Sequence, residues 1–175
     1  MKRFIMLALV ALLFGVTSAK ADYQIGYEEN LPGSWSLKVW ENNKVWHGCS
    51  VDKVFTGPEG HKRSNLGFLL NQDSFQMALV FEEPVFFVSG TEQVEYAFRV
   101  DGDKIFRGTA AVEKQTAFLT LDWNLDIVRE VQDGKKLEVK VGDSGYWFPL
   151  VGSRNALNKL MECYKYGLES LQRKQ

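Results

Sequence analysis

The sequence has few of the residues that most often carry chemistry, with two cysteines and two histidines in 175 residues. His47 and His61 stand at spacings from Cys49 and Cys163 that fit no zinc motif, so we expect no metal and no other cofactor. An excess of positive charge is also lacking, since 21 Lys and Arg stand against 22 Asp and Glu. This balance argues against nucleic acid as a partner, because nonspecific binding of nucleic acid depends on neutralising its phosphates.

No hydrophobic run reaches the roughly 20 residues that a membrane-spanning helix needs. The longest, residues 4–16, follows two cations and precedes Ala19 and Ala21, which is the pattern of a cleaved signal peptide. We predict a signal peptide over residues 1–21 and a single domain over residues 22–175. Without the leader, 18 cations stand against 22 acids. We therefore expect a bacterial protein of the periplasm or of the medium, with no stable membrane anchor after cleavage.

Export changes the expectation for the two cysteines. In an oxidising compartment an even number of cysteines favours a disulfide, here between Cys49 and Cys163. The alternative is a pair of buried free thiols. We predict the disulfide, which would join an early strand to the last helix of the chain.

Most of the chain alternates apolar and polar residues over short segments, and this period of two is typical of strands. Turn-forming residues stand between the segments. The pattern predicts a mainly β domain, an antiparallel β-sandwich or a barrel-like sheet with a C-terminal α-helix packed on it. We expect strands over residues 35–40, 45–51, 64–70, 75–81, 93–100, 104–112, 117–121, 137–141 and 146–150.

Two segments show helical spacing instead. Residues 124–132 place apolar side chains three residues apart and end at an Asp-Gly pair. Residues 153–172 carry a longer apolar stripe that includes Cys163, and Ser153 stands where an N-cap is expected. The stripe would turn Cys163 toward the sheet, where Cys49 is expected.

The first expected hairpin provides a test of strand register. A two-residue loop would mix polar and apolar side chains on each face, whereas a three-residue loop sets Leu37 opposite Cys49 and gives one mostly apolar face. We predict the longer loop. It places Trp40 beside Trp46, near Lys38, on the outer face, and these three residues form our candidate binding surface. The alternative is that the two indoles are covered and serve in packing.

Two short motifs resemble catalytic or metal-binding sequences and are better explained as local structure. Residues 142–145 read Gly-Asp-Ser-Gly, as around the nucleophile of trypsin-like proteases, but the match ends there and the chain is too short for two barrels. Residues 122–126 resemble the start of a calcium loop, which fails at Ile127, where a glycine is needed. We predict a tight turn and a helix start, no calcium and no enzyme.

Several short segments follow one another in a distinctive order: residues 35–37, Cys49, a strand pair ending near Pro84, residues 96–102 and residues 148–157 followed by Cys163. This order resembles the invasion-associated locus B family of small exported proteobacterial proteins. The resemblance implies a periplasmic β-sandwich with a terminal helix, and it carries over no catalytic residue.

We therefore predict a noncatalytic binding protein that recognises another cell-envelope protein through an exposed sheet face or edge. One form of this function is inhibition of an enzyme, for which residues 56–63 offer a long polar loop. The alternative is a carrier of a small apolar or lipid ligand. A carrier would need a cavity lined by the rings of Phe68, Phe75, Phe81, Phe98 and Phe118.

Overall fold

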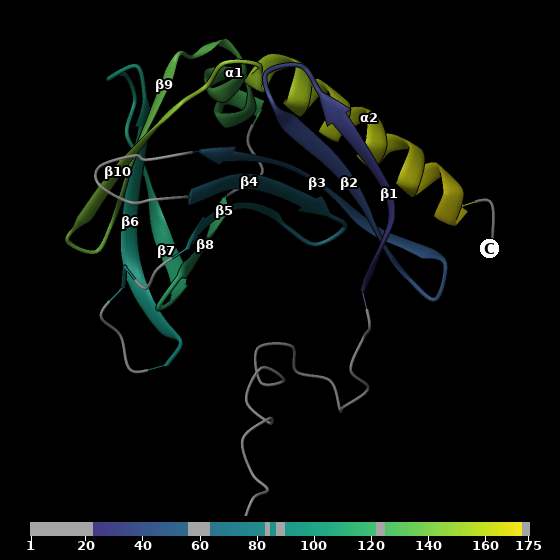
Figure 1. Cartoon of the computed structure of the whole chain (residues 1–175), viewed down its shortest axis with the longest axis horizontal. Helices are drawn as coiled ribbons and strands as arrows, with labels where there is room; N and C mark the ends of the chain where they lie inside the picture. Colours follow the sequence, from purple (N-terminus) through teal and green to yellow (C-terminus); the bar gives the residue numbers. More distant parts are fainter. Residues whose placement is uncertain (1–22, 56–63, 83–84, 87–89, 122–124, 173–175) are drawn as a thin grey trace, which may run out of the picture.

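The computed structural model describes residues 23–55, 64–82, 85–86, 90–121 and 125–172. The predicted leader, residues 1–21, and the polar loop, residues 56–63, lie outside this range. The described residues form one antiparallel sheet in the order β1-β2-β3-β4-β5-β8-β7-β6-β9-β10, with α2 packed on it and α1 packed against α2 (Figure 1). The elements are β1 (Gln24–Leu31), β2 (Trp35–Asn42), β3 (Val45–Phe55), β4 (Ser64–Asn71), β5 (Phe75–Phe81), β6 (Glu92–Val100), β7 (Phe106–Glu113), β8 (Thr116–Leu121), α1 (Leu125–Asp133), β9 (Lys136–Val141), β10 (Ser144–Pro149) and α2 (Ser153–Gln172).

The predicted fold class is confirmed, and the sheet is of the open, barrel-like kind. It does not close, because β1 and β10 remain as its two edges. Every predicted strand is present, with bounds that differ by a few residues. Strand β1 was not predicted. Most of its side chains are exposed, so its sequence lacks the apolar alternation that marks a strand buried on one face.

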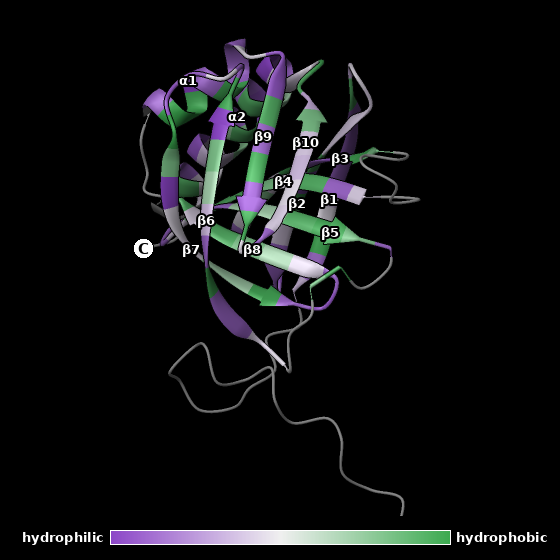
Figure 2. Ribbon diagram, turned by 90° about the vertical axis from the view of Figure 1, so that its left-hand side faces the viewer, coloured by the Kyte–Doolittle hydropathy of each residue, from purple (hydrophilic) through white to green (hydrophobic). Residues whose placement is uncertain are grey.

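The sheet bends so that strands far apart in its order meet across one core. The ring of Phe55 on β3 lies 5.3 Å from that of Phe148 on β10, and Phe81 on β5 lies 4.7 Å from Tyr146 on β10, between ring centroids. Along most strands alternate residues face this core, as the pleat requires. Figure 2 shows the resulting alternation of hydrophobic and hydrophilic residues along the strands.

The two helices lie together over part of the sheet, and α2 crosses β2, β3 and β4. The predicted apolar stripe of α2 is confirmed, with Ala156, Leu157 and Leu160 fully buried. Ser153 does not cap its own helix. Its hydroxyl donates to the Val131 carbonyl of α1 at 2.8 Å and so fastens the helices to each other. No helix in the described ranges combines the length and the hydropathy needed to cross a membrane.

The predicted disulfide between Cys49 and Cys163 is confirmed. It joins β3 to α2, with a Cα–Cα distance of 6.2 Å and 114 residues of sequence separation. Such a bond fits a protein that folds outside the reducing cytoplasm.

The turn before α2 packs against the turn before β2 and holds the two halves of the sheet together. The Trp35 indole and the Lys53 ammonium both donate to the Val151 carbonyl, at 3.0 and 3.1 Å. Partial burial in this contact lowers the pKa of Lys53. Gly152 has a φ of 87°, and a Cβ there would lie 2.7 Å from the Pro32 carbonyl oxygen. A side chain at residue 152 would force the two turns apart.

Candidate binding surfaces

The first hairpin departs from the predicted register because β3 contains a bulge. Asn42 pairs with Val45, so the loop has two residues, and the register shifts after Glu41 pairs with Trp46. Beyond the bulge Leu37 lies opposite Val51, not opposite Cys49. The predicted faces are therefore correct beyond the bulge, but the loop length and the cross-strand partners are wrong. The sequence pattern predicted which side chains share a face, but it did not reveal the extra residue of the bulge in β3.

The bulge separates the two tryptophans of the predicted surface. Trp40 lies opposite Gly48 and donates from its indole to the Ser50 hydroxyl at 2.8 Å. Lys38, on the same outer face, pairs with Asp52 at 2.7 Å. Trp40 and Lys38 therefore lie together as predicted, and both are held by polar partners on β3.

Trp46 lies on the other face, under α2. Its ring is 5.9 Å from that of Tyr164, and its indole nitrogen is 3.4 Å from the Cys49 sulfur. Gly167 passes so close that a Cβ on it would overlap the indole. The side-by-side pair of Trp40 and Trp46 was thus a wrong prediction, because the bulge turns Trp46 toward the helix.

The face that Trp46 occupies carries an open groove between β1, β2 and α2, which we call the helix groove. Its volume is about 380 Å³. Apolar side chains and the disulfide form its floor and polar side chains its rim. It is lined by Tyr27, Glu29, Leu37, Val39, Glu41, Trp46, Lys159, Glu162, Cys163, Tyr166, Gly167 and Ser170.

The charge on the rim of the helix groove is mainly negative. On the helix side Lys159 and Glu162 form an ion pair at 2.8 Å, and this contact raises the pKa of Lys159. On the sheet side Glu29 and Glu41 form no ion pair with any of the described residues. The groove therefore presents two carboxylates beside an apolar floor.

Strand β1 forms one wall of this groove and one edge of the sheet. An edge strand leaves a row of backbone amide and carbonyl groups without strand partners. A second bulge, at Gly26, sends neighbouring side chains of β1 to opposite faces. Ile25 lies opposite Trp40 on the outer face, and Tyr27 lies opposite Val39 in the groove.

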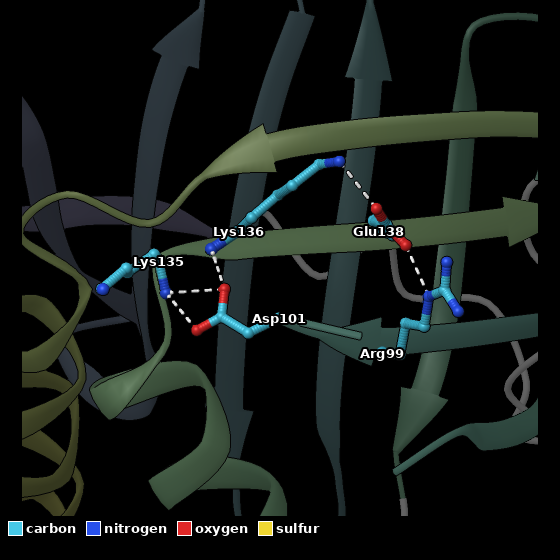
Figure 3. Close-up of polar contacts among 5 residues, drawn as sticks. All are labelled: Arg99, Asp101, Lys135, Lys136 and Glu138. Atoms are coloured by element: carbon cyan, nitrogen blue, oxygen red, sulfur yellow. Dashed lines mark hydrogen bonds and ion pairs between the residues drawn. The ribbon is translucent and has the colours of Figure 1, made fainter. Parts of the chain in front are cut away.

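A second hollow lies on the outer face near the other edge of the sheet, across β6, β7, β9 and β10. Its volume is about 590 Å³, and we call it the outer hollow. At its centre Glu138 accepts hydrogen bonds from Arg99 and Lys136 (Figure 3). The Asp101 carboxylate accepts from the backbone amides of Lys135 and Lys136, at 3.0 and 2.8 Å, and so fixes the start of β9.

The contacts of Glu138 predict a specific pH dependence. Hydrogen bonds from Lys136 and Arg99 lower its pKa in the folded protein. A folded-state pKa below the unfolded value stabilises the fold above the unfolded pKa, and this contribution is lost as the pH falls through the folded pKa. We expect Glu138→Gln to lower the urea midpoint slightly at pH 7 and to match wild type near pH 2. A difference that persists or grows in acid would contradict this assignment.

The rings predicted to line a ligand cavity do not converge on one. Phe68, Phe75, Phe81 and Phe98 are buried in the hydrophobic core, and the ring centroids of Phe68 and Phe75 lie 6.2 Å apart. Phe118 is 45% exposed on the outer face. Phe118 therefore does not share a cavity with the other four rings, as the carrier alternative required.

Ser144 of the Gly-Asp-Ser-Gly motif and His47 lie far apart in the order of the sheet. Ser144 begins β10, after the predicted tight turn, at one edge. His47 is on β3, toward the other edge, where its ring stacks on Tyr23 at 4.2 Å. Within the described ranges no three His, Cys, Asp or Glu side chains gather as a metal site would require.

Comparison with known proteins shows a likeness in fold. No protein-family model and no curated protein matches the chain. A solved structure is similar to this chain in its fold. It is that of invasion associated protein B from Bartonella henselae, with a TM-score of 0.50 and 17% identity over 79% of this chain and 99% of that one. The broad resemblance predicted from the sequence is confirmed at the level of the fold.

Proposed function

We propose that this chain is a noncatalytic binding protein of the bacterial periplasm or of the medium, and that it holds another envelope protein in the helix groove. The observation that carries the proposal is an edge strand, β1, that borders an open apolar groove. The partner would contribute an extended segment that carries Lys or Arg.

The shape of the site supports an extended segment. A chain that lies along β1 can form main-chain hydrogen bonds with its open edge, and alternate side chains then enter the groove. Tyr27 and Tyr166 stand at the groove, 54% and 68% exposed. Half-exposed tyrosines are common anchors in protein interfaces, because they bury a large apolar area while the hydroxyl keeps a polar contact.

The charge of the site supports a basic segment. Glu29 and Glu41 stand on the sheet side of the groove, and the Lys159–Glu162 pair on the helix side is neutral overall. Complementary charges at the rim of an interface mainly raise the association rate and select among partners, while the apolar floor provides affinity. A Lys or Arg beside each glutamate would complete the match.

The noncatalytic character of the proposal follows the composition of the groove. Leu37 and Val39 do not transfer protons, and the charged side chains of the lining serve in this proposal as rim charges that select a basic partner. His47 stacks on Tyr23 and does not line the groove. Binding alone accounts for the apolar floor and the acidic rim.

The test is charge reversal on the two faces of the same sheet. The variant Glu29→Lys/Glu41→Lys reverses the groove acids. The control Glu95→Lys/Glu113→Lys makes the same change of charge on exposed residues of β6 and β7 that do not line the groove. Tagged proteins are crosslinked in the cell, and the captured envelope proteins are quantified by mass spectrometry. The affinity for the enriched protein is then measured with purified components.

We expect one envelope protein to be enriched by wild type and by the control, with about tenfold weaker binding to the groove variant. That factor corresponds to roughly 1.4 kcal/mol for two rim charges whose attraction becomes repulsion. Equal capture by the groove variant and wild type would contradict the proposal. Circular dichroism and melting temperatures verify that both variants are folded.

A further inference from the structure

We infer that the outer hollow is a second binding site, and that it takes a sugar residue bearing a carboxylate, as part of an anionic glycan. The site lies near the β10 edge of the sheet, away from the helix groove, which lies at the β1 edge. The inference does not rest on the proposed function, because the two sites share no lining residue.

The strand register forms the hollow by placing small residues in one row. Gly145, Lys140, Ala97 and Arg107 lie side by side across β10, β9, β6 and β7. Gly145 has open space where a Cβ would stand. The row therefore has a depression between its two cations, where a sugar-sized group can reach the backbone surface of the sheet.

The charge around the depression is positive on a chain whose net charge is −1. The hollow is lined by four cations, Arg99, Arg107, Lys136 and Lys140, and by two acids, Glu138 and Asp143. Arg99 and Lys136 share Glu138, and the bond from Arg99 uses its Nε, so its terminal amino groups keep their donors. Arg107 and Lys140 form no ion pair with any residue that the structure describes. Two unpaired cations at one small depression are suited to a carboxylate.

An exposed indole flanks the same depression and points to a sugar. Trp147 lies in the next row, opposite Glu138, and is 41% exposed. The Lys136 ammonium lies 5.6 Å from its ring centroid and so helps to hold the ring in place. The flat face of an indole packs against the C–H face of a pyranose ring, while the nearby cations bind its carboxylate.

The location on a sheet face favours a glycan over an acidic peptide. A peptide gains much of its affinity for a sheet from main-chain hydrogen bonds at an edge. Although β10 is an edge strand, the unpaired cations Arg107 and Lys140 stand on the inner strands β7 and β9, away from the backbone groups of that edge. An indole and cations can together bind a pyranose ring and its carboxylate.

The test uses three probes on the purified, oxidised protein at low salt. Hexagalacturonate provides a carboxylated glycan, cellohexaose a neutral one, and hexaglutamate an acidic peptide of matched charge. Binding is measured by calorimetry and by the NMR shift of the Trp147 indole, assigned from its loss in Trp147→Leu. The site variants are Arg107→Gln/Lys140→Gln and Trp147→Leu. The matched control, Arg129→Gln/Lys165→Gln, removes two exposed cations from the helices.

We expect hexagalacturonate to bind and to shift the Trp147 indole, and cellohexaose and hexaglutamate to bind at least about tenfold more weakly. The double cation variant should weaken binding about tenfold, Trp147→Leu should weaken it severalfold, and the control should match wild type. The inference is overturned if hexagalacturonate does not bind or if hexaglutamate binds equally well. Equal weakening by the control variant would also overturn it. Because the substituted side chains are exposed, melting temperatures close to that of wild type are expected.

Discussion

Replacing both Cys49 and Cys163 with alanine is expected to lower the free energy of unfolding by roughly 4–5 kcal/mol. The disulfide closes a loop between residues 114 positions apart, and in the chain-entropy model a crosslink over such a distance restricts the unfolded chain strongly. The loss is measured as the shift of the urea midpoint and converted with the slope of the unfolding transition. Among the described residues it is the one covalent crosslink between side chains.

Reduction of the wild-type protein provides the control for this prediction. Cys49 is fully buried beside Trp46, so the alanine variant also loses packing around the sulfur. The reduced wild-type protein keeps both sulfur atoms, and we expect it to lose slightly less stability than the double variant. A loss below about 1 kcal/mol in both samples would contradict the account of the disulfide as the main link between β3 and α2.

Replacing Trp35 with alanine is expected to cost about 3–5 kcal/mol. The indole is 1% exposed, its centroid lies 6.3 Å from that of Phe68, and its N–H donates to the Val151 carbonyl. The variant leaves a large cavity at the junction of β2 with the turn before α2. It also removes one of the two hydrogen bonds that the Val151 carbonyl accepts, the other coming from Lys53, at a further cost on the order of 1 kcal/mol.

The matched control for Trp35 is the same substitution at Trp147, which is 41% exposed. Trp147→Ala removes the same atoms from the surface and should change stability by less than about 1 kcal/mol. Both variants are measured by urea denaturation under identical conditions. Equal losses would show that Trp35 does not hold the two halves of the sheet together as described.

The alternating pattern of the sequence predicted most of the strands, because alternate residues of most strands face a single core. In β5 buried and more exposed residues alternate from Phe75 to Phe81, and the predicted bounds match the structure. The C-terminal helix was equally clear, since its stripe ran over several turns and included Cys163. The disulfide then followed from export, from two cysteines and from a stripe that faced the sheet.

The features that escaped prediction depend on single-residue irregularities or on long-range register. The bulge in β3 moves Trp46 to the helix side, and the bulge at Gly26 separates Ile25 from Tyr27. No periodicity reveals an extra residue in a strand of mixed polarity. The outward orientation of Phe118, however, could have been predicted from the alternation along β8. Its neighbours Ala117 and Leu119 face the core, so Phe118 between them faces outward.

Neither binding surface has a sequence motif. The helix groove combines β1 and β2 with α2, and the outer hollow combines side chains from β6, β7, β9 and β10. Their residues come together only through the strand order β8-β7-β6-β9-β10 and through the packing of the last helix on the first strands. The sequence of each segment by itself does not predict the order of the strands in the sheet.

The most direct test of the proposed function is photocrosslinking from two positions on the same strand. Tyr27 and Ile25 are similarly exposed, at 54% and 46%, but they face the groove and the outer surface respectively. A benzophenone amino acid is placed at each position in turn, and crosslinks are induced in the exporting cell. We predict an adduct with one envelope protein from residue 27 and little of it from residue 25. The same adduct from residue 25 alone, or in equal yield from both positions, would contradict binding in the helix groove.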